Sequence, residues 1–232
     1  VFIDANNPHL MGIAEGLDLV TYGTPARPDL FVSGKVVSAA PFLRFAWQRE
    51  GGAWNEVQTH LVGAYNVLNM LAALSVGLFL GVSAEEANRA LANYVPSNNR
   101  SQLEETAHNK LIMDAYNANP SSMHTAIENF LSTSGTQAKY LILGDMFELG
   151  SASREEHLAL VQRLARETTG ITCYLVGKEF AALESEAKAP HLHYFPSTEI
   201  LAEQLRLAPI EHAFILVKAS RGMHFESLVE LC

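Results

Sequence analysis

The stretch Asp114-Ala-Tyr-Asn-Ala-Asn-Pro120 places polar side chains directly after an apolar segment. A carboxylate at the end of a strand can accept hydrogen bonds from a ribose diol, as an acidic residue does in dinucleotide-binding folds. Asn119 and Pro120 also have a structural explanation, because Asn is a good N-cap and Pro is tolerated at the first helical position. That explanation does not cover Asp114 or Asn117. Ribose binding and simple capping are therefore both open for this segment.

Asn66 and Asn69 lie three residues apart in Gly63-Ala-Tyr-Asn-Val-Leu-Asn69, at the start of a predicted helix. Residues at this spacing share one helix face. An Asn amide offers a donor beside an acceptor, which complements the edge of an adenine base. The alternative is a solvated polar face at a helix start.

Two further loops carry groups that could contact a ligand. Gly144-Asp145 ends an apolar segment, where Gly allows close backbone approach, although an ordinary turn explains it equally well. In Val217-Lys-Ala-Ser-Arg-Gly-Met223, the cations Lys218 and Arg221 flank the hydroxyl of Ser220 and could clamp a carboxylate or a phosphate. The alternative is a solvated, charged loop.

Several catalytic and metal-binding patterns are missing from the sequence. No G-x-x-x-x-G-K-[ST] motif occurs, and no Ser-His-Asp or Cys-His arrangement is recognisable. His191 and His193 would share a strand face, but no carboxylate or thiol ligand is near them in the sequence. We therefore predict no metal site in this chain.

Beyond residue 100, short apolar segments alternate with helical ones. We predict strands at 110–115, 140–144, 172–177, 192–195 and 213–218, and helices at 121–131, 154–168, 179–185, 197–207 and 225–231. This alternation is typical of an α/β domain whose mainly parallel sheet is covered on both faces. Ligands bind at the carboxyl edge of such sheets, which is where the polar loops described above begin.

The first hundred residues have mixed character. Five strand-like segments precede residue 60, at 1–4, 17–22, 30–37, 42–48 and 53–59, and the last two flank a Gly51-Gly52 turn that favours a hairpin. Helices are predicted at 64–80 and at 83–94, the second with Ser83 and Glu86 as a capping box. The polar segment Pro96-Ser-Asn-Asn-Arg100 interrupts the pattern and is the predicted domain boundary.

Composition narrows the class of protein. The chain has 232 residues, is 48% hydrophobic and carries a net charge of -9. This negative charge argues against non-specific binding to nucleic acids or to an anionic membrane surface. No apolar run is long enough to span a membrane, and two cysteines form no disulfide framework, so we expect a cytoplasmic protein. The chain starts at Val1 inside a strand-like segment, and we expect it to be part of something longer.

Taken in order, five motifs resemble the Mur ligases of peptidoglycan synthesis. Within that family they resemble most the members that add D-alanyl-D-alanine to UDP-N-acetylmuramoyl-tripeptide. The motifs are Gly63-x-x-Asn66-x-x-Asn69, Asn98-Asn-Arg-Ser-Gln102, Asp114-Ala-Tyr-Asn-Ala-Asn-Pro120, Gly144-Asp-Met-Phe-Glu-Leu-Gly150 and Lys218-Ala-Ser-Arg-Gly222.

The resemblance implies a domain organisation and a reaction. Residues 1–100 would end a central ATP-binding domain, and residues 101–232 would form a Rossmann-like C-terminal domain. The P-loop and the Mg²⁺ ligands would precede Val1, so the chain alone is expected to be inactive. The protein is also expected to be a monomer. ATP would convert the tripeptide carboxylate to an acyl phosphate, which the amine of D-Ala-D-Ala attacks.

The resemblance also implies residue roles. The nucleotide would be contacted by Asn66 and Asn69 on the adenine side, by Arg100, and by Asp114 at the ribose. The substrates would be contacted by Asn117, Asn119, Asp145, Lys218, Ser220 and Arg221. Two positions depart from the family pattern, because Tyr65 replaces a common His and Ala219 replaces a common Gly.

Two other functions remain open at this point. The chain could belong to a nucleotide- or peptide-binding Rossmann-like module without catalysis. It could also belong to a sister enzyme, such as another Mur ligase or a folylpolyglutamate synthase, which takes a different amino substrate.

Overall fold

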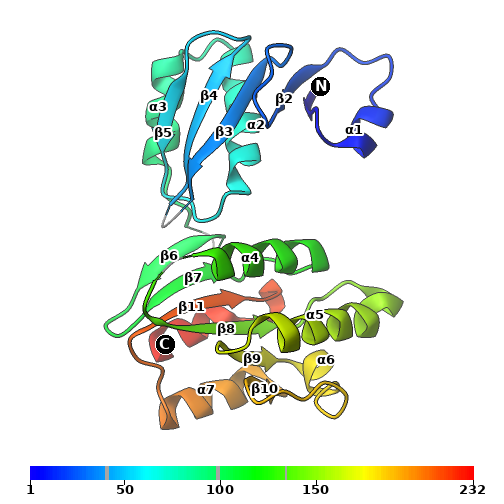
Figure 1. The fold of residues 1–232 in the computed structure, drawn as a ribbon, viewed down its shortest axis with the longest axis vertical. Helices are drawn as coiled ribbons and strands as arrows, with labels where there is room; N and C mark the ends of the chain where they lie inside the picture. The colour runs from blue at the N-terminus through cyan, green and yellow to red at the C-terminus, as the bar shows by residue number, and fades with distance from the viewer. Residues whose placement is uncertain (40–41, 98–99, 134) are drawn as a thin grey trace. The chain divides into compact units, whose positions relative to one another are not determined.

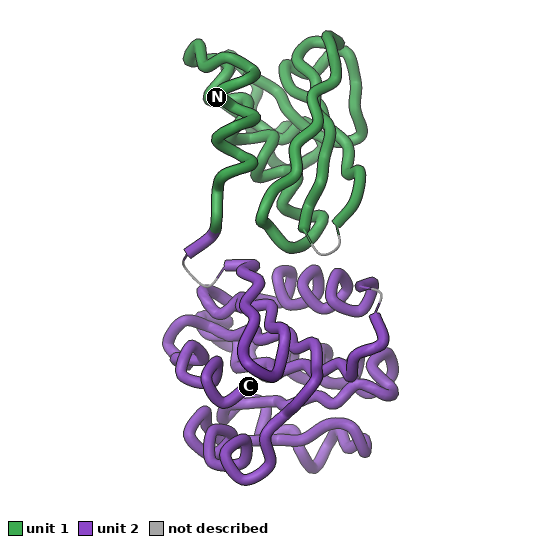
Figure 2. The backbone as a smooth tube through the Cα atoms, turned by 90° about the vertical axis from the view of Figure 1, so that its left-hand side faces the viewer, with its two compact units in different colours: residues 1–95 green, residues 96–232 purple. Residues whose placement is uncertain are grey.

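The structure, a computed structural model, describes residues 1–39, 42–97, 100–133 and 135–232. It divides into two compact units, Val1–Val95 and Pro96–Cys232 (Figures 1 and 2). The division falls next to the polar segment at 96–100, of which Asn98 and Asn99 lie outside the described residues. Over the described residues, no helix combines the length and the apolar composition that crossing a bilayer requires.

The first unit is built on a five-stranded mixed sheet in the order β1-β2-β3-β4-β5. The pairings β1–β2 and β2–β3 are parallel, whereas β3–β4 and β4–β5 are antiparallel. The strands are β1 (Phe2–Asp4), β2 (Val20–Gly23), β3 (Val32–Ser38), β4 (Arg44–Arg49) and β5 (Asn55–Gln58). The predicted hairpin is confirmed by the β4–β5 pairing, while the short helix α1 (Pro8–Gly12) was not predicted.

Two helices cover this sheet. In α2 (Asn66–Phe79), Leu71 and Leu74 are fully buried, because apolar residues recur every three or four positions and face the strands. The helix packs so closely on β3 that a Cβ at Gly34 would lie 2.7 Å from a methyl group of Leu71. The next helix, α3 (Ala84–Asn93), begins with the predicted Ser83–Glu86 capping box.

The second unit contains a six-stranded sheet in the order β10-β9-β8-β11-β7-β6. All pairings are parallel except that of the edge strand β6. The strands are β6 (Gln102–Glu105), β7 (Lys110–Asp114), β8 (Ala138–Gly144), β9 (Thr172–Val176), β10 (Leu192–Phe195) and β11 (Ala213–Lys218). The mainly parallel α/β sheet predicted from the sequence is confirmed, whereas β6 was not predicted.

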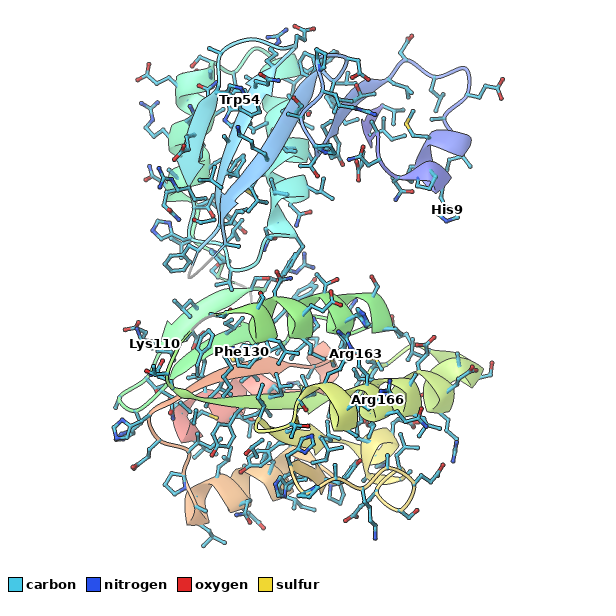
Figure 3. All side chains as sticks on the ribbon, viewed as in Figure 1. His9, Trp54, Lys110, Phe130, Arg163 and Arg166 are labelled. Carbon is cyan, nitrogen blue, oxygen red and sulfur yellow. The ribbon has the colours of Figure 1, made fainter. Side chains whose placement is uncertain are left out.

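Helices cover both faces of this sheet, as Figure 1 shows. Successive side chains of β11 point to opposite faces of the sheet. On one face, Ile215 and Val217 belong to a hydrophobic cluster with residues of α7 (Thr198–Leu207) and the 3-10 helix η3 (Phe225–Leu231). On the other face, Phe214 stacks on Phe130 of α4 (Pro120–Ser132). On the α4 side, Arg163 of α5 (Ser153–Glu167), which is labelled in Figure 3, forms an ion pair of 3.1 Å with Glu128 of α4. Both faces of each central strand are therefore buried, which explains their continuous apolar sequences.

The topology determines which loops meet. The chain leaves β7 through α4, moves outward through β8, β9 and β10 with α5 and α6 (Lys178–Ala181), and returns through α7. The returning strand β11 inserts between β8 and β7. The loops after β7, β8 and β11 consequently leave neighbouring points of one carboxyl edge, where open α/β sheets bind their ligands.

Candidate functional site

The end of β7 is joined to the end of β11 by a buried ion pair. Lys218 Nζ lies 2.6 Å from Asp114 Oδ2 and donates a second hydrogen bond to the carbonyl of Asn117 at 3.1 Å. The Lys218 side chain is only 2% exposed. Its charge is held inside the protein, which is a different role from the ligand clamp expected from the sequence.

Asp114 has a second partner on the chain that leads into β6. Its Oδ1 atom accepts a hydrogen bond of 3.3 Å from the backbone N–H of Ser101, a residue with a positive φ of 49°. A carboxylate has about four lone-pair sites. Asp114 is 15% exposed at its side chain and therefore retains acceptor capacity toward a ligand.

The two predicted asparagines of the following loop have different roles. Asn119 is the N-cap of α4, where its side chain accepts from the backbone N–H of Ser122 at 2.8 Å. Capping therefore accounts for Asn119 and for Pro120 behind it. Asn117 holds Lys218 through its carbonyl while the residue itself is exposed, so its amide is accessible to a ligand.

Asp145 is buried and serves as a cap for helix α6. Its two carboxylate oxygens each accept a 3.1 Å hydrogen bond, from the backbone N–H groups of Glu179 and Phe180. Gly177 is required beside it, because a Cβ there would lie 2.2 Å from the carboxylate. Burial raises the pKa of Asp145, and the two N–H donors oppose that shift only in part. This arrangement is structural and leaves little of Asp145 for the substrate.

His157 was not predicted as part of this region. Its Nδ1 lies 2.7 Å from the carbonyl of Ser153, so Nδ1 carries the proton, while Nε2 accepts from the backbone N–H of Met146 at 3.0 Å. Both nitrogens are satisfied in the neutral ring. The 3.8 Å approach of Nε2 to Asp145 is therefore not an ion pair. His157 fixes the loop that follows β8.

The loop after β11 combines a buried hydroxyl with an exposed cation. Ser220 Oγ accepts a hydrogen bond of 2.9 Å from the backbone N–H of Phe147, which ties this loop to the one after β8. Ala219 is fully buried, and a Cβ at Gly144 would approach it to 2.7 Å. Arg221 is exposed and lies over the ring of Tyr116, as does Arg100.

In the first unit, Asn66 and Asn69 form a short hydrogen-bonded chain. Asn66 is buried and donates to the carbonyl of Val62 at 2.8 Å, and its Oδ1 accepts from Asn69 at 3.0 Å. Asn69 is exposed, and one hydrogen of its side-chain amide is used in the bond to Asn66. Asn66 therefore orients Asn69, which is the better candidate to contact a base.

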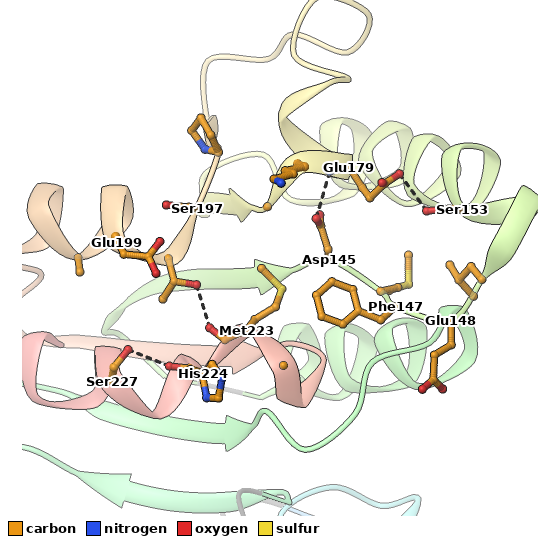
Figure 4. Close-up of a pocket in the computed structure, with 18 of the residues that line it drawn as sticks. Asp145, Phe147, Glu148, Ser153, Glu179, Ser197, Glu199, Met223, His224 and Ser227 are labelled. Atoms are coloured by element: carbon orange, nitrogen blue, oxygen red, sulfur yellow. Dashed lines mark hydrogen bonds between the residues drawn. The ribbon is translucent and has the colours of Figure 1, made fainter.

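In the second unit, a cavity of about 940 Å³ is lined by the loops that follow β8, β9 and β10 (Figure 4). Phe147, which is 46% exposed, contributes its ring to the lining. The remaining lining residues include Glu148, Glu179, Glu199, Glu203, Arg206 and His224. Within the described residues, no group of three His, Cys, Asp or Glu side chains could hold a metal ion.

The predicted site residues thus divide into four groups, of which Asn66 and Asn69, bonded to each other in the first unit, are one. Asp114, Asn117 and Lys218 meet at the ends of β7 and β11, and Arg100 and Arg221 meet on Tyr116. Ser220, Asp145 and Asn119 are occupied within loops and caps. Tyr116 and His157 were missed, because an aromatic residue in a loop and a helical histidine have no distinctive spacing.

Comparisons with known proteins agree on one family. The model described as "Mur ligase, glutamate ligase domain" matches residues 99–221, more than half of the chain. The UDP-N-acetylmuramoyl-tripeptide--D-alanyl-D-alanine ligase of Bacillus subtilis is 31% identical over 177 residues, which are 73% of this chain and 38% of that protein.

Solved structures show the same similarity. MurF from Acinetobacter baumannii matches 99% of this chain and 51% of that chain with a TM-score of 0.80 and 25% identity. A Thermotoga maritima MurF ligase in complex with ADP matches 99% of this chain and 52% of that chain with a TM-score of 0.79 and 22% identity. The chain spans about two fifths of the length of the curated relative described above.

Removing the ammonium of Lys218 is expected to leave Asp114 as an uncompensated carboxylate. Lys218→Met should lower the free energy of unfolding of the second unit by roughly 3 kcal/mol, and Lys218→Met/Asp114→Met should recover most of that loss. Urea unfolding followed by far-UV circular dichroism measures both. Trp47 and Trp54 lie in the first unit, so an unchanged tryptophan transition is the control. Equal losses in the single and double variants would contradict the pairing.

The pKa of Asp145 is expected to be higher than that of an aspartate in the unfolded chain, because the side chain is buried. Because its folded pKa is raised, the folded state holds the proton more tightly than the unfolded chain does. Its contribution to stability is therefore present at low pH and is lost as pH rises through the folded pKa. The carboxyl ¹³C shift of Asp145, assigned with Asp145→Asn, should show a midpoint above about 3.9. A midpoint at or below that value would disprove the assignment.

Proposed function

Because the chain belongs to the Mur ligase family of ATP-dependent ligases, we propose that it supplies adenosine and amino-substrate contacts to such a ligase. The reaction would be the addition of D-alanyl-D-alanine to UDP-N-acetylmuramoyl-tripeptide. The name and the 31% identity of the Bacillus subtilis relative support this choice. The chain spans 38% of that relative, so the whole activity is proposed for a longer protein that contains this chain.

The proposed domain roles follow the two units. Residues 1–100 would complete the ATP-binding domain and residues 101–232 would form the C-terminal domain. The family match at 99–221 and the parallel sheet of the second unit support the latter assignment. The mixed sheet of the first unit, with Asn69 exposed at the start of α2, is compatible with the former.

One observation carries the nucleotide assignment. Asp114 is a carboxylate fixed at the carboxyl edge of a parallel sheet, with one oxygen on Lys218 and the other on Ser101. Both bonds orient the carboxylate and leave lone pairs for ribose hydroxyls. The exposed amide of Asn69 provides the donor and acceptor that an adenine edge requires. Each side chain, considered within its own unit, offers the hydrogen-bonding groups that one part of adenosine requires.

The ATP phosphates, the Mg²⁺ ion and the amino substrate require contacts other than those proposed for adenosine. ATP would supply the phosphoryl group that activates the tripeptide carboxylate as an acyl phosphate. The described residues offer no cluster that fits Mg²⁺, so no residue of this chain is assigned to it. The amino substrate would be met by the exposed Asn117 and by the loop after β11, which Ser220 anchors to Phe147.

The two alternative functions differ from this proposal in measurable ways. A binding module without catalysis would bind nucleotide but would support no ligation in the longer protein. A sister ligase would prefer another amino substrate in a panel that includes D-Ala-D-Ala, D-glutamate and L-glutamate. The names of the relatives favour the dipeptide over both alternatives.

Adenosine binding can be measured on this chain directly. Asn69→Leu should weaken binding of ADP about five-fold, the effect of one lost hydrogen bond, and Asp114→Asn should weaken it by a similar factor. NMR titration of the 232-residue chain with ADP gives the dissociation constants. Asn93→Leu removes another exposed amide from a helix of the first unit and is the matched control. Equal affinities in all four proteins would refute the site.

Ligation by this chain alone is expected to fail. Its sequence contains no G-x-x-x-x-G-K-[ST] motif to hold the nucleotide phosphates. Phosphate release should therefore stay at background with ATP, Mg²⁺, UDP-N-acetylmuramoyl-tripeptide and D-Ala-D-Ala. The complete Bacillus subtilis ligase serves as the positive control. Phosphate release that depends on D-Ala-D-Ala would show that the 232 residues suffice.

A further inference from the structure

Tyr116 carries two guanidinium groups on one ring. The guanidinium carbon of Arg100 lies 3.7 Å from the ring centroid, and that of Arg221 lies 5.3 Å from it. The two carbons are thus no more than about 9 Å apart, the sum of these distances. One arginine precedes β6 and the other follows β11, so two segments far apart in the sequence converge on this ring.

Neither arginine has an anionic partner within the protein. Among the residues that the structure describes, no carboxylate forms an ion pair with Arg100 or Arg221, and the same holds for arginines 89, 166 and 206, whereas arginines 27, 44, 49, 154 and 163 each have one. The third cation of this region, Lys218, is neutralised by Asp114. Two uncompensated positive charges therefore stand together on a protein whose net charge is -9.

Like charges that share one ring repel each other, and an anion bound to both would remove this cost. Each guanidinium presents several N–H donors in a planar fork that matches the oxygens of a phosphate or a carboxylate. A tetrahedral anion with three free oxygens can hydrogen-bond to two forks at once, because each N–H···O bond adds close to 3 Å of reach. A dianionic phosphoryl group also balances both charges, whereas one carboxylate balances only one.

We propose that Arg100 and Arg221 form a single phosphoryl-binding site on the Tyr116 ring, with Tyr116 as its positioning residue. The sequence motifs had placed the two arginines on different ligands, the nucleotide and the amino substrate. The source of the phosphoryl group rests on the proposed ligase function, whereas binding of inorganic phosphate does not depend on it.

The ring explains why two exposed arginines can act together. A cation over an aromatic face is attracted to it, which restricts side chains that would otherwise sample many rotamers. Tyr116 follows Asp114 by two residues, and Arg221 follows Lys218 by three, so the ion pair between the strands sets the spacing of the ring and one arginine. Tyr116 would thus act through the arginines and need not touch the anion itself.

The test uses the 232-residue chain and three probes: inorganic phosphate and ADP as phosphoryl probes, and D-Ala-D-Ala as the carboxylate probe. NMR titrations follow the Nε–H signals of the arginines and the ring signals of Tyr116. Arg100→Gln and Arg221→Gln should each weaken phosphate binding about ten-fold, the effect of losing one charged hydrogen-bonding group. Arg166→Gln removes an exposed arginine elsewhere on the unit and should change nothing.

The role of the ring is separated from that of the phenol by two variants. Tyr116→Phe keeps the aromatic face and should bind phosphate as the wild-type chain does, while Tyr116→Leu should weaken binding about five-fold. Arg100→Gln should have a smaller effect in the Tyr116→Leu background than in the wild type, because the two side chains act as a unit.

The outcomes distinguish this inference from the proposed function. The inference is wrong, and the nucleotide site stands, if ADP affinity depends on Asn69 and Asp114 while phosphate affinity is unchanged in the Tyr116 and arginine variants. If phosphate binding follows the ring and the arginines but ADP does not bind, the anion site stands without the nucleotide assignment. If D-Ala-D-Ala alone responds to Arg221→Gln, the two arginines serve separate ligands and the inference is overturned.

Discussion

The contact between Lys218 and Asp114 constrains the whole carboxyl edge of the second sheet. The two residues are register partners on adjacent parallel strands, and the ammonium group is almost completely buried. Removing a lysine from water is costly unless a counter-charge and further acceptors replace the solvent, and here Asp114 and the carbonyl of Asn117 do so. The ends of β7 and β11 are therefore held in one arrangement, and so are the loops that leave them.

This contact exists only because of the order of the strands. Lys218 and Asp114 are 104 residues apart, and they become neighbours when α7 returns the chain so that β11 inserts between β8 and β7. The same insertion brings Ser220 to the backbone of Phe147 on the loop after β8. One topological feature thus gathers three loops that the sequence presents as unrelated.

The strands of the second unit were predictable because burial on both faces produces short apolar runs, and β10 and β11 begin and end as expected. The cap at Asn119 was predictable from local chemistry. The edge strand β6 was not, since its residues Gln102–Glu105 are mostly polar and form a strand only by pairing with β7. Nor could the sequence show that Lys218 and Asp145 point inward, because their partners come from distant strands and from a helix start.

The burial of Lys218 changes how the charge of this region is distributed. A lysine that neutralises Asp114 contributes nothing to the attraction of an external anion, so that attraction falls to the arginines that remain outside. Arginine suits this task because its weakly hydrated planar group can rest on an aromatic face and still donate hydrogen bonds at its edge. Tyr116 offers that face two residues beyond Asp114. The buried pair and the exposed pair therefore have complementary roles, one fixing the strand ends and the other presenting charge to a ligand.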